Sequence, residues 1–128
     1  MVIRRARLTD LAPLAALERA AFVYPWGGLD LLGGFLPGGR VLVAETGGQV
    51  MGYALCRGRS LARLAVYPAY RRQGVARALV QAVLRPGLQV QVRAGNPAAR
   101  ALYAGLGFAE VGACRYRDGE AGSRLRWE

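Results

Sequence analysis

The chain of 128 residues contains no histidine and no lysine, and only two cysteines and two serines. A Ser-His-Asp triad and a Cys-His pair both need an imidazole to take the proton of the nucleophile, so neither can be assembled. A zinc site is excluded as well, because two cysteines without histidine do not supply its usual ligands. Any chemistry of this chain must therefore proceed without imidazole and without zinc.

The two cysteines, Cys56 and Cys114, lie in the strand-like segments YALCRG and VGACRY. The first ten residues, MVIRRARLTD, contain no apolar stretch of signal-peptide length, and no apolar run is long enough to span a bilayer. A chain without an export signal seldom forms disulfides, so both thiols are expected to be free. We expect a cytoplasmic protein that does not bind membranes.

The chain carries 18 arginines against 8 acidic residues, which gives a formal net charge of +10. Codon usage in a G+C-rich genome explains an arginine bias most simply, but the charge also suits a phosphate-bearing ligand or a partner rich in nucleic acid, such as a ribosome. A dedicated nucleic-acid-binding domain is the competing interpretation. The arginines are scattered from Arg4 to Arg126 with no recognition-helix or aromatic RNA-binding pattern, so we predict no dedicated nucleic-acid-binding motif.

The length and the 53% content of hydrophobic residues predict one domain, residues 1–128, with a core of its own. Apolar residues recur with helical spacing in some segments and alternate with polar residues in others. Thr9 and Asn96 are predicted to cap helices. The predicted helices are Asp10–Phe22, a short helix between 27 and 39, Val75–Leu84 and Ala98–Leu106, and the predicted strands are Val2–Leu8, Val41–Glu45, Gln49–Arg57, Arg59–Tyr67, Leu88–Arg93, Phe108–Tyr116 and Ser123–Trp127.

The segment Leu64–Leu79, LAVYPAYRRQGVARAL, passes from an apolar strand through a proline-marked loop into a helix. A helix N-terminus presents free backbone N–H groups and the positive end of the helix dipole, and the arginines of this loop add charge. Gly74 and the small Ala76 allow a ligand to approach the backbone closely. These features predict a cradle for a diphosphate group, with a plain helix start as the alternative.

The same segment has the pattern R/Q-x-x-G-x-G/A, which resembles the phosphate-binding signature of the GNAT acetyltransferases. A second block, VRAGNPAARALYAGLGF at Val92–Phe108, is similar to the other hallmark of that family and follows at the expected distance. The resemblance spans nearly the whole chain. It implies an α/β (α+β) GNAT fold with a central mixed, mostly antiparallel sheet of about seven strands flanked by about four helices. It also implies an acetyl-CoA-dependent N-acetyltransferase without a metal.

The resemblance further implies roles for individual residues. The backbone of the strand before the loop would bond the pantetheine arm of acetyl-CoA as an added strand does. Asn96 would lie beside that arm, and Tyr103 would be the catalytic acid that protonates the leaving thiolate. A helix cap and a packing residue are the structural alternatives for these two. The cofactor-binding residues implied in this way are Leu64, Ala65, Val66, Arg71, Arg72, Gln73, Gly74, Val75, Ala76, Arg77 and Asn96.

Within the family, the chain is most similar to the ribosomal-protein-alanine N-acetyltransferases, which acetylate a protein α-amine. The likeness extends to ERAAFVYPW at Glu18–Trp26 and to RYRDGE at Arg115–Glu120. It implies that Trp26, Gln91 and Tyr116 bind the acceptor substrate and that this acceptor is a protein N-terminus. A small-molecule amine is the alternative acceptor.

Gln91 departs from the family pattern, because those enzymes carry a catalytic glutamate at this position. An amide accepts no proton at useful pH, so the expected general base is missing. A site without a base favours an α-amine, with a pKa of about 7.7–8.0, over a lysine amine, with a pKa of about 10.4. Two alternatives stay open: a base reached through water from Glu18, Glu45 or a tyrosine, and a catalytically weak acetyl-CoA-binding module associated with ribosomes.

Overall fold

The computed structural model describes every residue from Met1 to Glu128. The chain divides into two compact parts, an N-terminal unit of residues Met1–Val83 and a C-terminal unit of residues Leu84–Glu128. Whether the two units fold together as one domain stays a prediction. None of the helices is long and apolar enough to cross a membrane.

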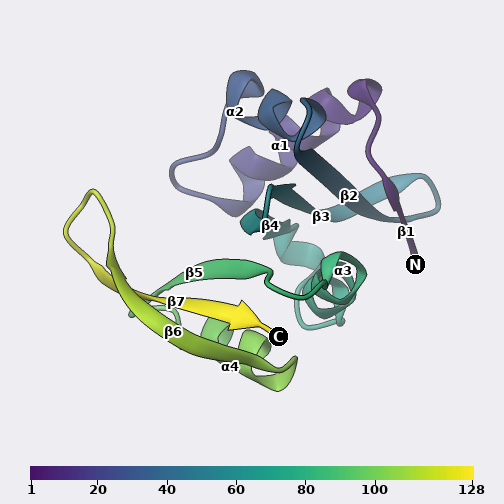
Figure 1. Ribbon diagram of the computed structural model, residues 1–128. Helices are drawn as coiled ribbons and strands as arrows, with labels where there is room; N and C mark the ends of the chain where they lie inside the picture. Colours follow the sequence, from purple (N-terminus) through teal and green to yellow (C-terminus); the bar gives the residue numbers. More distant parts are fainter. The chain divides into compact units, whose positions relative to one another are not determined.

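The N-terminal unit contains four antiparallel strands in the order β1-β2-β3-β4 (Figure 1). Tight turns connect β2 to β3 and β3 to β4, as the Gly47–Gly48 and Arg57–Gly58 pairs predict. The strands are β1 (Val2–Arg5), β2 (Gly39–Thr46), β3 (Gln49–Arg57) and β4 (Ser60–Val66), the helices are α1 (Leu11–Ala21), α2 (Gly28–Leu32) and α3 (Val75–Val83), and the 3-10 helices are η1 (Leu8–Asp10), η2 (Gly33–Phe35) and η3 (Pro68–Tyr70).

Helices cover both faces of these strands. On one face, Leu14 of α1 and Leu31 of α2 are fully buried in the same apolar cluster as Tyr53 of β3. Neighbouring residues of a strand point to opposite faces. A Cβ placed on Gly52 would lie 3.3 Å from Leu79, so α3 covers the other face. The N-terminal unit is thus a three-layer arrangement with β2, β3 and β4 in the middle.

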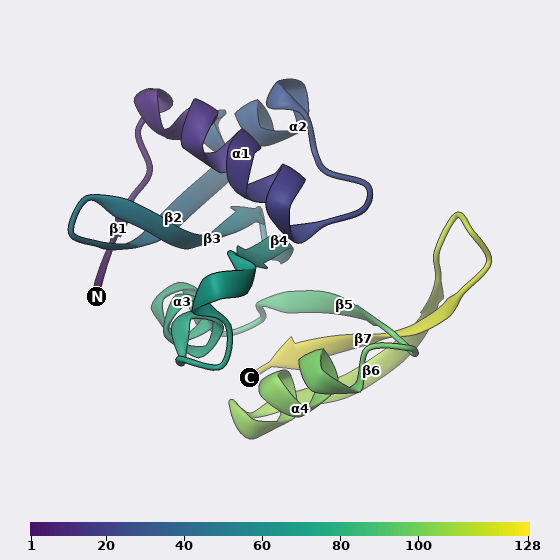
Figure 2. The same cartoon turned by 180° about the vertical axis from the view of Figure 1, so that it is seen from behind.

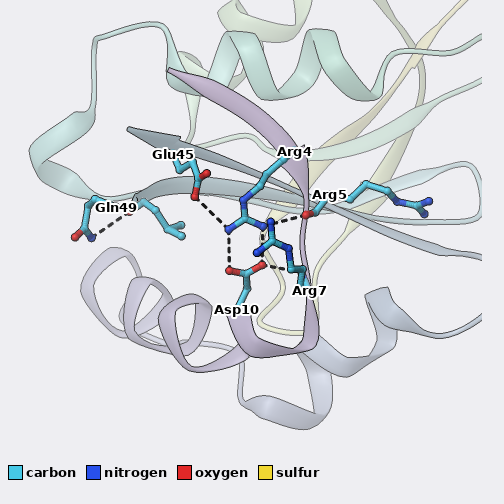
Figure 3. Close-up of polar contacts among 7 residues, drawn as sticks. Arg4, Arg5, Arg7, Asp10, Glu45 and Gln49 are labelled. Atoms are coloured by element: carbon cyan, nitrogen blue, oxygen red, sulfur yellow. Dashed lines mark hydrogen bonds and ion pairs between the residues drawn. The ribbon is translucent and has the colours of Figure 1, made fainter. Parts of the chain in front are cut away.

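Arg4 of β1 ties the start of the chain to η1 and to β2 (Figure 3). Its guanidinium donates two hydrogen bonds to the Asp10 carboxylate, at 2.9 and 3.0 Å, and a third to Glu45 at 3.2 Å. Asp10 also accepts the backbone N–H of Arg7 at 2.7 Å. The bonds from Arg4 hold the pKa of Asp10 below its usual value, against the opposing effect of burial.

The C-terminal unit contains three antiparallel strands in the order β5-β7-β6 and one helix (Figure 2). The elements are β5 (Gln89–Arg93), α4 (Pro97–Gly105), β6 (Phe108–Arg115) and β7 (Ala121–Trp127). α4 packs on β6, where the rings of Tyr103 and Phe108 meet edge to face with centroids 5.3 Å apart. Val90 and Val92 are buried, whereas Gln91 is exposed on the opposite face, as their alternation predicts.

The predicted elements are all present, and the differences lie at their ends. β1 stops at Arg5 instead of Leu8, because Leu8–Asp10 form the 3-10 helix η1. The predicted cap by Thr9 is wrong: Thr9 lies inside η1, and Asp10 precedes α1 without a capping hydrogen bond from its side chain. The carboxylate of Asp10 instead accepts two hydrogen bonds from the Arg4 guanidinium. Neither cysteine forms a disulfide, as expected; Cys56 is buried and Cys114 is half-buried.

Candidate active site

The predicted phosphate cradle lies in the N-terminal unit, between the end of β4 and the start of α3. After η3 the chain turns through residues 71–74, in which Arg72 has a φ of 65° and Gly74 a φ of 79°. Left-handed backbone costs an arginine about 1–2 kcal/mol, whereas glycine adopts it freely. Strain of this kind is retained where a particular turn is needed, which favours a functional reading of this loop.

The first turn of α3 leaves backbone donors without partners in the helix. The first helical bond runs from the Ala78 N–H to the Gly74 carbonyl, at 3.0 Å. The N–H groups of residues 75–77 therefore have no acceptor within α3 and lie at the positive end of its dipole. Arg71, Arg72 and Arg77 are exposed around them. Residues 71–77 thus combine free donors and positive charge, which fits a diphosphate group.

Leu64, Ala65 and Val66 lie at the end of β4 that leads into this loop. The pairing of β4 with β3 is irregular just before them, because Leu55 pairs with Arg63 while the next residue, Cys56, pairs with Leu61. This bulge leaves Ala62 unpaired and keeps Arg63 on the same face as Leu55 and Ala65. The side chain of Arg63 therefore points towards α1.

Glu18 of α1 is 0% exposed, and four donors surround its carboxylate. Arg63 donates from Nη2 to Oε1 at 2.7 Å and from Nε to Oε2 at 3.1 Å. The Tyr53 hydroxyl donates at 2.5 Å and the backbone N–H of Trp26 at 2.8 Å. The Arg63 guanidinium also lies over the rings of Phe22 and Trp26, 3.7 and 4.9 Å from their centroids. Both members of this buried ion pair therefore contact Trp26, which is predicted to bind the acceptor: Glu18 contacts its main chain and Arg63 its ring.

The electrostatics of Glu18 follow from these contacts. Burial raises the pKa of its carboxyl, but the hydrogen bonds from Arg63, Tyr53 and the Trp26 N–H outweigh it, so the net shift is downward. Burial and the bond to Glu18 in turn raise the pKa of Tyr53. Glu45, the other carboxylate considered as a base reached through water, is paired with Arg4. The lowered pKa disfavours Glu18 as a proton acceptor in catalysis, and both carboxylates are engaged in ion pairs.

In the C-terminal unit, Gln91 and Tyr116 lie on the same side of the strands. Gln91 pairs with Arg124 of β7, and Arg124 pairs with Gly112 of β6. The guanidinium of Arg93 lies over the Tyr116 ring, 4.0 Å from its centroid. We call this side, which faces away from α4, the open face; its residues are Gln89, Gln91, Arg93, Gly112, Cys114, Tyr116, Gly122, Arg124 and Arg126.

Arg93, at the end of β5, forms ion pairs with two carboxylates in the turn between β6 and β7. Its guanidinium donates to Asp118 at 2.7 Å and to Glu120 at 2.8 Å, and the Glu120 carboxylate accepts the Gly95 N–H at 3.0 Å. The bond from Arg93 is the main cause that lowers the pKa of Glu120. Partial burial and the neighbouring Cys114 raise the pKa of Tyr116. Tyr116 is therefore a neutral phenol at neutral pH, held in place under Arg93.

Asn96 and Tyr103 have the structural roles that the sequence analysis left open as alternatives. The Asn96 Oδ1 accepts the Ala99 N–H at 3.1 Å, which confirms the helix cap. Tyr103 is 4% exposed and packs on Phe108, on the α4 side of the strands. The structure thus brings Gln91 and Tyr116 together on the open face and places Tyr103 on the other face. The binding role of Asn96 and the acid role of Tyr103 stay predictions.

Two features of the site were not predicted from the sequence: the Glu18–Arg63 ion pair and the position of Arg124 beside Gln91. Glu18 continues the helical spacing of the buried Leu14 and Leu17, and Arg63 interrupts an apolar strand. Because buried charges are paired, a glutamate and an arginine at two positions with a buried pattern could have predicted an ion pair between them. Arg124 carried none, because an arginine alternating with apolar residues is typical of any exposed strand face.

Comparison with known proteins agrees with this geometry. Residues 37–110 match the profile of the acetyltransferase (GNAT) domain. The N-alpha-acetyltransferase of Sulfurisphaera tokodaii is 32% identical over 92% of this chain and 87% of its own length. The [ribosomal protein bS18]-alanine N-acetyltransferase of Escherichia coli K12 is 33% identical over 80% of this chain and 77% of its own. The crystal structure of the ribosomal-protein-S18-alanine N-acetyltransferase from Escherichia coli aligns with a TM-score of 0.90, at 27% identity, over 98% of this chain and 92% of that one.

These likenesses define an acyltransferase that acts on amines. The chain belongs to the GNAT acetyltransferase family, whose members use acetyl-CoA. Its GNAT fold, with seven strands and four α-helices, confirms the fold class expected from the sequence. The likeness to the ribosomal-protein-alanine N-acetyltransferases is confirmed as well.

Proposed function

We propose that the protein transfers the acetyl group of acetyl-CoA to the N-terminal α-amine of a protein. The observation that carries this proposal is that relatives named for α-amine acetylation match 80% or more of the chain at 32% and 33% identity. A ribosomal-protein alanine is the acceptor that the Escherichia coli relative suggests, and the net charge of +10 would favour association with a ribosome. Such an enzyme would work in the cytoplasm.

The loop at residues 71–77 and the end of β4 supply the groups that would bind acetyl-CoA. The N–H groups and arginines of residues 71–77 would hold the diphosphate, and the backbone of Leu64–Val66 would bond the pantetheine amides. Asn96 would lie beside the same arm. When bound, acetyl-CoA supplies the thioester carbonyl that the amine attacks, so that a C–N bond forms and the C–S bond breaks. Tyr103 would give the proton that the departing sulfur needs.

The acceptor amine must lose a proton during the reaction, and this chain has no side chain placed to accept it. Gln91 cannot take its proton, and Glu18 and Glu45 are held in ion pairs. An α-amine needs little help, because about a quarter of it is neutral near pH ~7.4, against about one part in a thousand of a lysine amine. Holding the neutral amine against the thioester then supplies most of the catalysis. The missing base therefore supports an α-amine as the acceptor.

Mass spectrometry of acceptors incubated with acetyl-CoA tests the proposal. The acceptors are a peptide with a free α-amine and one internal lysine, the same peptide with its α-amine blocked, and a small polyamine. We expect one acetyl group, on the α-amine, and little product from the other two. Product from the polyamine alone would favour the small-molecule reading, and no product from any acceptor would favour a weak acetyl-CoA-binding module.

A further inference from the structure

The open face carries one arginine that has no acidic partner. Arg93 is neutralised by Asp118 and Glu120. Arg126 is paired with Glu128 at 2.6 Å. Arg124 lies between these two arginines on the same face, is exposed, and forms no ion pair within the molecule. Its charge is available to a ligand.

The side chain of Arg124 occupies space that the absence of a side chain on Gly112, its pairing partner on β6, leaves open. A Cβ placed on Gly112 would lie 2.9 Å from Nη2 and 3.3 Å from Nε of Arg124. The guanidinium therefore lies across the backbone of β6 at Gly112, in space that any other residue would fill. Arg124 is also the direct pairing partner of Gln91 on β5. An unpaired guanidinium over Gly112, beside the predicted acceptor-binding residue Gln91, is suited to bind a carboxylate with two hydrogen bonds.

The charge of the whole chain favours the same kind of ligand. Seven of its eight carboxylates are engaged in ion pairs. The eighth, Asp30, accepts the Gly27 N–H at 3.0 Å. Every acidic side chain of the C-terminal unit therefore already has an arginine partner, and the net charge of +10 repels a basic acceptor. An acidic acceptor is attracted both by this field and by Arg124.

We infer that the acceptor is a protein N-terminus with an aspartate or glutamate at its second or third position, and that Arg124 binds this carboxylate. The inference rests on the proposed function and on the predicted role of Gln91 in binding the acceptor, which would put the acceptor amine beside Gln91. Residues opposite each other in an antiparallel pair have Cβ atoms about 4.5–5.5 Å apart. An extended peptide rises about 3.4 Å per residue. A side chain one or two positions after an amine at Gln91 is therefore within reach of Arg124.

The test measures kcat/KM for peptides that differ only at the second and third residues, which are both Glu, both Gln or both Lys. We expect the wild-type protein to acetylate the Glu peptide at least tenfold better than the Gln peptide and to prefer Lys least. Arg124→Gln should remove the preference between Glu and Gln, and Arg124→Glu should reverse the order of Glu and Lys. Gly112→Ala keeps the arginine but displaces its guanidinium, so it should weaken the preference as well.

Arg126→Gln is the matched control, because it removes the same charge from the same strand but from an arginine that already has a partner. It should keep the wild-type preference. Thermal unfolding of each variant checks that the exposed substitutions leave the fold intact. Equal rates on the Glu and Gln peptides, or a preference that survives in Arg124→Gln, would overturn the inference while leaving α-amine acetylation in place. Failure of wild type to acetylate any of the peptides would overturn both.

Discussion

We predict how much the Glu18–Arg63 ion pair contributes to the free energy of unfolding. Arg63→Met removes two of the four donors to a carboxylate that is 0% exposed, and it leaves the charge buried. Breaking a buried ion pair by removing one partner costs about 3–5 kcal/mol. Arg63 itself is 19% exposed, so water would partly replace it, and we expect a loss near the lower end of that range. Such a loss is a large fraction of the stability of a small protein.

The loss should depend on pH in a defined direction. In the wild type the folded pKa of Glu18 is lowered, so the carboxylate stabilises the fold above its unfolded pKa of about 4.3, and this contribution disappears as the pH falls through the folded value. In Arg63→Met, burial dominates and the pKa of Glu18 rises above its unfolded value. The variant then becomes relatively more stable as the pH falls and Glu18 takes up a proton. The difference between the two proteins should therefore be largest near pH ~7 and smaller near pH ~4.5.

Urea unfolding followed by circular dichroism at both pH values measures this difference. The double variant Glu18→Gln with Arg63→Met is the control, because it removes the buried charge together with its partner and should recover part of the loss. A loss below about 1 kcal/mol at pH ~7, typical of a surface pair, would show that Glu18 does not depend on Arg63 as a buried charge depends on its partner. So would a loss of the same size at both pH values.

Three further predictions concern the proposed chemistry. Gly74→Val forces a β-branched residue to a φ of 79° and blocks approach to the loop, so calorimetry should show acetyl-CoA binding weakened at least tenfold, about 1.4 kcal/mol; unchanged affinity in a folded variant would exclude this loop as the cradle. Tyr103→Phe should lower kcat and leave the Kd for acetyl-CoA unchanged, whereas single-turnover transfer at the wild-type rate would make Tyr103 a packing residue only. Gln91→Glu places a carboxylate opposite Arg124, which holds the pKa of the new group down and makes it a weak base. On the Gln peptide, which offers Arg124 no carboxylate, activity below pH ~8 should therefore rise in the double variant Gln91→Glu with Arg124→Gln and not in Gln91→Glu alone; a rise in the single variant would contradict this.

The fold could be predicted because its signals are local. The hairpin at Gly47–Gly48, the cap at Asn96 and the buried face of α3 each depend on a few consecutive residues. The error at Thr9 has a tertiary cause. A threonine before a helix is a good cap in isolation, but Arg4 draws Asp10 into an ion pair and the chain enters α1 through a 3-10 turn.

The site was predictable only as far as its motifs reach. The loop at residues 71–77 is contiguous in sequence, so its pattern could be recognised directly. Glu18 and Arg63 are far apart in sequence, and their contact depends on a bulge in β4 that no short pattern encodes. The neighbours of Gln91 depend on strand register, and register is what places Arg124 beside it. Features that join distant segments therefore had to come from the structure.

If the protein acetylates an α-amine without a general base of its own, its rate should follow the ionisation of the acceptor amine. The most direct measurement is the pH dependence of kcat/KM on one peptide that carries both a free α-amine and a lysine, with the position of each acetyl group read by mass spectrometry. We expect acetylation of the α-amine, with kcat/KM rising with pH and levelling off near the amine's own pKa of about 8. Preferential acetylation of the lysine, or a profile that is flat from pH ~6 to pH ~9, would exclude a base-free reaction on an α-amine.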